Sequence, residues 1–102
     1  MTLETRPWDS AEFLETEEDM QEFLTVAFEG NDPVHIAKAL GTVAKARSMS
    51  KLARDVGMTR AALYRAFSGE TRPEFATIMK ILDALGIGIV PVIRHGDTDK
   101  AA

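Results

Sequence analysis

The residues between Ser50 and Ser68 constrain the fold of this chain more than any other segment. Ala53 is small enough to let two helices approach closely, and Gly57, four residues later, can take the positive φ that a tight turn requires. Thr59 can then cap a second helix through its hydroxyl. Apolar residues occupy positions where two crossed helices share a core: Leu52, Val56, Met58, Leu63 and Ala66. The spacing predicts a helix-turn-helix, whose second helix enters the major groove of DNA.

Two helices are expected before this motif. Thr16 and Asp19 resemble a capping box, and Gly30 is a plausible stop. The apolar face of this first helix has helical spacing and comprises Met20, Phe23, Leu24, Ala27 and Phe28. Asp32-Pro33 predicts the start of a second helix, which runs to about Arg47. Its expected buried face comprises Ile36, Ala37, Leu40, Val43 and Ala44.

The motif and one further helix complete the expected fold. Ser48-Met-Ser50 ends the preceding helix and caps the first helix of the motif, and the recognition helix is predicted over about Arg60–Phe67. Pro73 is expected to open the last helix, which Gly86 ends. One face of that helix is expected to carry Phe75, Ile78, Met79, Leu82 and Leu85. The predicted fold class is therefore mainly all-α, with five helices.

The segment after Gly86 is too short and too β-branched for another helix and predicts a strand. Its apolar residues are Ile87, Ile89, Val90, Val92 and Ile93. Pro91 lacks an amide hydrogen, which suits an edge or a bulge. Because a lone strand leaves backbone groups unpaired, the favoured interpretation is pairing with its copy in a second chain. The alternative is an unpaired tail packed on its own domain.

The length of 102 residues favours one domain. Residues 1–15 are predicted to form an N-terminal arm, in which Asp9–Glu12 can start one helical turn. Residues 16–95 are predicted to form the DNA-binding domain with its C-terminal strand, and residues 96–102 a disordered tail. Three apolar residues of the arm can dock on a core: Trp8, Phe13 and Leu14.

Charge is distributed unevenly along the chain, although the net charge is only −4. Residues 1–32 carry 1 basic and 10 acidic side chains, residues 33–82 carry 9 basic and 3 acidic, and residues 83–102 carry 2 basic and 3 acidic. A basic middle can meet phosphate, whereas an acidic N-terminal region repels it or meets something else. For any single charge, a solvated surface position is the simpler interpretation.

The recognition helix is expected to bury Leu63, Ala66 and Phe67. Five residues then become candidates for contact with bases: Thr59, Arg60, Ala61, Tyr64 and Arg65. An arginine can donate two parallel hydrogen bonds to guanine O6 and N7, and the methyl groups of Ala61 and Thr59 suit a thymine methyl. Tyr64 can instead bond a phosphate or pack on a sugar. For either arginine alone, a phosphate contact or solvation is the alternative.

Further side chains are candidates for contact with DNA phosphates: Lys45, Arg47, Ser50, Lys51, Ser68 and Arg72. Ser50 and Lys51 lie at a helix N-terminus, where exposed amides favour an anion. Lys45 and Arg47 lie near a helix C-terminus, a placement that is also favourable without DNA.

An enzyme is not expected. His35 and His95 have no thiol or carboxylate at ligand spacing, and the chain has no cysteine, which excludes disulfides and thiolate metal sites. No apolar run approaches the roughly 20 residues that span a bilayer, and the N-terminus lacks the pattern of a secretory signal. We therefore expect a cytoplasmic protein with no cofactor, metal, membrane partner or small-molecule ligand.

The segment Ser50–Gly69, followed by Arg72–Gly86, resembles the Cro/cI-type helix-turn-helix superfamily, which implies a lambda-repressor-like domain. The resemblance is narrower to HigA-like addiction-module antidote proteins, and extends to Trp8–Leu14, the helix start at Thr16–Asp19, and Arg60–Arg65. It covers roughly residues 5–93. Lys51 stands where the superfamily often has Gln, and Arg72 where Asn is frequent, so the contacts there depart from the usual pattern.

The resemblance implies a homodimeric type II antitoxin that binds its own operator and neutralises a RelE/HigB-like toxin. Because such a ribonuclease meets RNA and is expected to be basic, the acidic N-terminal region has the charge to attract it. Two alternatives are a stand-alone dimeric transcription regulator without a toxin and an interaction module that has lost DNA binding.

Overall fold

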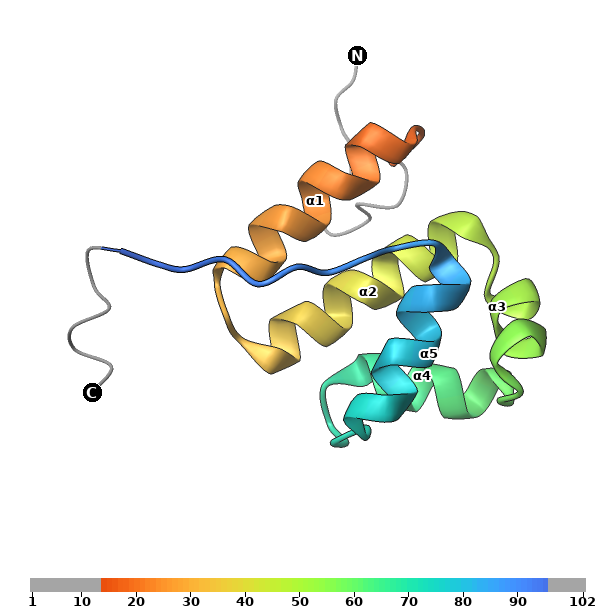
Figure 1. Ribbon diagram of the computed structural model, residues 1–102. Helices are drawn as coiled ribbons and strands as arrows, with labels where there is room; N and C mark the ends of the chain where they lie inside the picture. The colour runs from red at the N-terminus through yellow and green to blue at the C-terminus, as the bar shows by residue number, and fades with distance from the viewer. Residues whose placement is uncertain (1–13, 96–102) are drawn as a thin grey trace, which may run out of the picture.

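The computed structural model describes residues 14–95 (Figure 1). All regular secondary structure in this part of the chain is α-helical. Its elements are α1 (Glu17–Glu29), α2 (Pro33–Arg47), α3 (Met49–Val56), α4 (Arg60–Ser68) and α5 (Phe75–Leu85). The expected five helices are confirmed. The predictions for Trp8, Phe13, the turn at Asp9–Glu12 and the tail at 96–102 lie outside the described residues.

The first two helices begin as their capping residues predict. The Thr16 hydroxyl accepts a hydrogen bond from the Asp19 amide at 3.0 Å, and the Asp19 carboxylate accepts one from the Thr16 amide at 3.2 Å. This reciprocal pair is a capping box. At the start of α2, the Asp32 carboxylate accepts from the Val34 amide at 3.0 Å. The acidic side chains that open α1 also lie at the positive end of the helix dipole.

The core is built around α2, which packs against α1, α3 and α4. Leu40, Val43 and Ala44 are buried there, as expected from their spacing. The buried Gly41 was not foreseen. A Cβ at Gly41 would lie 2.8 Å from the Cβ of Phe67 on α4, closer than real Cβ atoms approach. The absence of a side chain at position 41 therefore allows α2 and α4 to pack at this distance.

The last helix differs from its sequence prediction. It begins at Phe75 after Glu74, rather than at Pro73. Phe75 is 71% exposed and Met79 is also exposed, so these two residues do not belong to the buried face. The buried residues of α5 all lie in its second half, which packs against α3: Ile81, Leu82 and Leu85. The first residue of α5 therefore lies outside the core. A helical repeat of apolar residues shows which face of a helix can be buried, but not which part of its length another helix covers.

The segment that follows α5 is extended and crosses over α1 and α2 (Figure 1). It does not form the predicted strand within residues 14–95. At its start, the Ile87 amide donates to the Leu82 carbonyl at 2.9 Å. The nearby elements are helices, which offer no free strand edge, so a ladder cannot form inside the described chain. At the other end of the described chain, Leu14 is buried as expected.

Candidate nucleic-acid interface

The turn between α3 and α4 has the geometry that its sequence requires. Gly57 has φ 75° and ψ 30°, which is the left-handed region. The amides of Gly57 and Met58 both donate to the Ala53 carbonyl, at 2.9 Å and 3.0 Å, and thereby close the end of α3. Ala53 is buried, as its expected role in a close helix crossing requires. The two bonds converge on the Ala53 carbonyl at the point where the chain turns out of α3.

Hydroxyl groups begin both helices of this unit. The Ser48 hydroxyl accepts from the Lys51 amide at 3.1 Å, so Ser48 is the cap of α3 and Ser50 is exposed in its first turn. The Thr59 hydroxyl accepts from the Ala62 amide at 3.0 Å at the start of α4. Removal of such a cap costs about 1 kcal/mol. Thr59 therefore fixes the position at which α4 begins.

The orientation of α4 agrees with its sequence prediction. Leu63 is 0% exposed, and Ala66 and Phe67 are buried with it. Four of the candidate residues for base contact are exposed on the helix itself: Arg60, Ala61, Tyr64 and Arg65. The fifth, Thr59, is exposed directly before the helix. The fold therefore brings all five onto one exposed element.

Arg60 and Tyr64 are neighbours on the exposed face. An Arg60 guanidinium nitrogen donates to the Tyr64 hydroxyl at 3.4 Å, and the guanidinium carbon lies 5.9 Å from the ring centroid. A cation over an aromatic face is attracted by about 0.5–1 kcal/mol at an exposed site. Because the Tyr64 oxygen accepts in this contact, its own hydrogen remains available to an acceptor such as a phosphate oxygen.

The end of α4 is held through the backbone of Arg65. Its carbonyl accepts from the Ser68 hydroxyl at 2.8 Å and from the Thr71 hydroxyl at 3.0 Å. The Ser68 oxygen also accepts from the Glu70 amide at 3.0 Å. Ser68 thus uses its hydroxyl hydrogen within the protein, which makes it a poor phosphate donor. The side chain of Arg65 projects from a backbone that these bonds hold in place.

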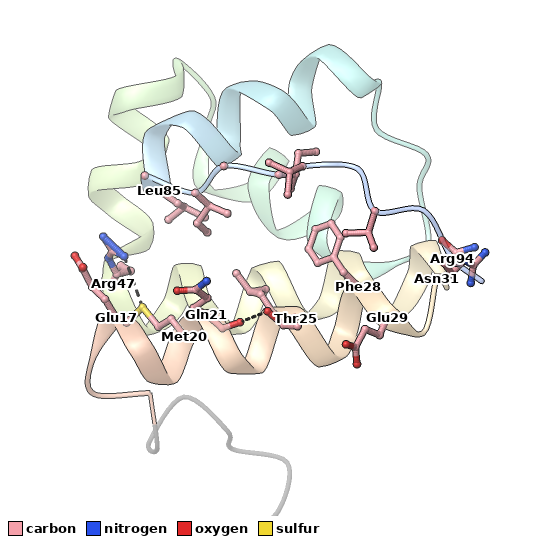
Figure 2. Close-up of a pocket in the computed structure, with 17 residues that line it drawn as sticks. Glu17, Met20, Gln21, Thr25, Phe28, Glu29, Asn31, Arg47, Leu85 and Arg94 are labelled. Carbon is pink, nitrogen blue, oxygen red and sulfur yellow. Dashed lines mark hydrogen bonds between the residues drawn. The ribbon is translucent and has the colours of Figure 1, made fainter. Parts of the chain in front are cut away.

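The candidate phosphate residues are divided between two places. The Lys51 ammonium lies 2.9 Å from an Asp55 carboxylate oxygen, a surface pair worth about 0–1 kcal/mol that a phosphate can replace. Lys45 and Arg72 are exposed. Arg47 instead donates to the Met20 sulfur of α1 at 3.6 Å (Figure 2). This contact joins the end of α2 to α1.

A groove of about 1050 Å³ lies between α1 and the extended C-terminal segment (Figure 2). Apolar residues of α1 that line it are Met20, Leu24 and Phe28. Its opposite side comprises Leu85 and the segment up to Arg94. We call this the α1 groove. The apolar face of α1 and the β-branched segment were both visible in the sequence, but nothing there indicated that they lie side by side.

His35 and His95 are both exposed, and within residues 14–95 no group of three His, Asp or Glu side chains is placed to hold a metal ion. Among the described helices, none has the length and apolar character needed to cross a membrane.

Fold and surface together define a small all-helical protein with two neighbouring helices joined by a tight turn and an exposed basic helix. A family model described as "Probable addiction module antidote protein" matches residues 4–93. The chain belongs to this family. It is also 42% identical over 87 residues to an uncharacterized protein of Haemophilus influenzae, a match that covers 85% of this chain and 90% of that protein. No solved structure matches the chain.

Proposed function

We propose that this chain is a DNA-binding antitoxin of a type II toxin–antitoxin module, which represses its own operon and neutralises a RelE/HigB-like toxin. The α3–α4 unit then serves as a HigA-like helix-turn-helix of the Cro/cI type. The observation that carries the proposal is the exposed face of α4. Arg60, Tyr64 and Arg65 are exposed on this helix, and Leu63 is buried on its inner side. Membership of the antidote family supports the second part of the proposal, the neutralisation of a toxin.

The geometry of α4 supports contact with base edges. A recognition helix reaches bases with residues near its N-terminus, and Thr59, Arg60 and Ala61 occupy that end. Arg65 lies one turn further on, where its guanidinium can bind guanine O6 and N7 together. The first turn of α3 supports a phosphate contact through its exposed amides and Lys51. Charge agrees with this arrangement, since residues 33–82 carry the basic excess.

The acidic composition of α1 supports a second binding surface, for a protein partner, away from α4. An antidote family implies a cognate toxin. On the exposed side of α1, Val26 is 67% exposed, and Glu18 and Glu22 are exposed on the same helix. An apolar centre within a charged rim is the composition of a protein interface, and acidic groups attract a basic partner.

Operator binding is tested with Arg65→Ala. A bidentate base contact predicts a loss of about 1–3 kcal/mol on operator DNA and a smaller loss on random DNA, measured by fluorescence anisotropy at fixed salt. Lys80→Ala removes an equal charge from the exposed surface of α5 and is the matched control. Equal losses on both DNAs would make Arg65 a phosphate contact, and no loss from Arg65→Ala would exclude α4 as the DNA-binding element.

Toxin binding is tested with the product of the reading frame adjacent to the gene of this chain, which the proposal expects to be a basic protein. Glu22→Lys is expected to weaken that complex and to reduce its dependence on salt, because a like charge replaces an attraction. Asp83→Lys makes the same change on the exposed surface of α5 and serves as the control. If the adjacent frame encodes no protein that binds, the chain is a stand-alone regulator.

A further inference from the structure

Arg60 and Tyr64 form a side-chain pair on the exposed face of α4. Arg60 is the first residue of the helix and Tyr64 follows four residues later, so the two side chains are neighbours on one face. The Tyr64 hydroxyl accepts from the guanidinium at 3.4 Å, and the guanidinium carbon lies 5.9 Å from the ring centroid. The tyrosine therefore contacts this arginine through both its oxygen and its ring.

The contact leaves Arg60 most of its binding capacity. A guanidinium has five N–H donors, and the bond to Tyr64 uses one of them. Within residues 14–95, no carboxylate lies within ion-pair distance of Arg60. The positive charge and the remaining donors therefore stay available to acceptors outside the protein, and two donors are sufficient for guanine O6 and N7.

The Tyr64 hydroxyl can act in two directions at once. Its oxygen accepts from Arg60, and among the described residues no acceptor is bonded to its hydrogen. A hydroxyl that accepts from a cation is polarised, and a donor polarised in this way binds an anion more strongly. A phosphate oxygen is the anion that DNA presents beside a recognition helix, and tyrosine is one of the residues that bind it.

We propose that Tyr64 is a positioning residue for sequence recognition. Its hydroxyl accepts from Arg60 and donates to a DNA phosphate, and the bound phosphate thereby holds the Arg60 guanidinium against a guanine edge. This role rests on the proposed function, because it is a role within DNA binding. Specificity at the base that Arg60 reads then depends on Tyr64, a residue that touches no base.

Arg65 provides a comparison within the same helix. It follows Tyr64 directly, and adjacent residues of a helix do not face each other. In the described chain, the hydrogen bonds at Arg65 go to its backbone carbonyl, from the hydroxyls of Ser68 and Thr71. Tyr64 can therefore position Arg60 without positioning Arg65.

Tyr64→Phe tests the hydroxyl. The variant keeps the aromatic ring, and because Tyr64 is 43% exposed the core is not altered. Fluorescence anisotropy at fixed salt measures affinity for the DNA upstream of this chain's reading frame and for random DNA of equal length. Loss of the phosphate bond should weaken both complexes, and loss of positioning should weaken only the upstream complex further. The ratio of the two affinities should fall about 5-fold.

A double-mutant cycle separates positioning from the other roles of Tyr64. In an Arg60→Ala background there is no guanidinium to position, so Tyr64→Phe should leave the ratio unchanged. In an Arg65→Ala background, Tyr64→Phe should still lower it by about 5-fold. An unchanged ratio in the parent chain would make Tyr64 a phosphate contact alone. An equal fall in both backgrounds would indicate a general disturbance of α4. Either result would overturn the proposal.

The pair is also observable without DNA. Tyr64→Leu removes the ring and should shift the NMR signals of the Arg60 side chain more than those of Arg65. Unshifted Arg60 signals would exclude the pair in solution and overturn the proposal. If the pair is present but the parent chain does not prefer the upstream DNA to random DNA, the proposed function fails, and the role of Tyr64 fails with it. If that preference exists and Tyr64→Phe does not reduce it, only the role of Tyr64 is excluded.

Discussion

The α3–α4 unit and the α1 groove differ in how much of their structure one chain supplies. In the α3–α4 unit, capping hydroxyls, the left-handed Gly57 and the buried Leu63 complete the local hydrogen bonding and packing. Along the α1 groove, β-branched side chains face water beside an extended backbone. The comparison teaches that the α3–α4 unit completes its structure within one chain, whereas the α1 groove leaves apolar side chains exposed to water.

Truncation of one apolar side chain in each region should show the largest contrast. Leu63→Ala leaves a cavity at a fully buried site and should lower the free energy of unfolding by about 2–5 kcal/mol. Val90→Ala should change it by less than about 0.5 kcal/mol when the protein is monomeric. Urea unfolding at low protein concentration measures both. A large effect of Val90→Ala under those conditions would mean that the groove is already packed within one chain.

A smaller contrast is expected between two glycines. Gly57→Ala forces a side chain into the left-handed region and should cost about 1–2 kcal/mol, although nothing lies within 4 Å of the added Cβ. Gly88→Ala, in the extended segment, also enters open space but without positive φ. It should therefore change the stability of the monomer little. Thermal unfolding of the two variants measures the cost of placing a side chain at the positive φ of Gly57. Equal melting temperatures would contradict the expected difference between the two glycines.

The smallest contrast compares two threonines. Thr59→Ala removes the cap of α4 and should cost about 1 kcal/mol. Thr25→Ala removes a hydroxyl that donates to the Gln21 carbonyl within α1, at 2.8 Å, and should be neutral or slightly stabilising. Urea titration of both variants checks this. If Thr25→Ala lowers the free energy of unfolding as much as Thr59→Ala does, the hydrogen bond from Thr25 to the Gln21 carbonyl stabilises α1 as much as the Thr59 cap stabilises α4.

Sequence predicted the features whose causes are local. Asp32 and Thr59 cap the helices that they were expected to cap, and Gly57 turns the chain, because each effect depends on neighbours within a few residues. For the candidate site, the same local spacing was sufficient to place the outward face of α4. The DNA contacts themselves stay predictions.

Features that depend on distant neighbours were less predictable. Phe75 is exposed because the buried residues of α5 all lie in its second half, and periodicity does not encode which part of a helix is covered. The contact of Arg47 with the Met20 sulfur on α1 was not foreseen, because the two residues are far apart in the sequence. The strand over 87–93 was expected from composition, yet a ladder needs a second edge that the described chain does not supply.

The contact between Gly41 and Phe67 has a consequence for the exposed face of α4. Because the glycine sets the spacing between α2 and α4, a larger residue at position 41 must displace the helix that carries Arg60 and Arg65. The position of that face then depends on a side-chain volume in the interior. Variation at this single core position can therefore shift the exposed residues of α4 while their identities stay the same.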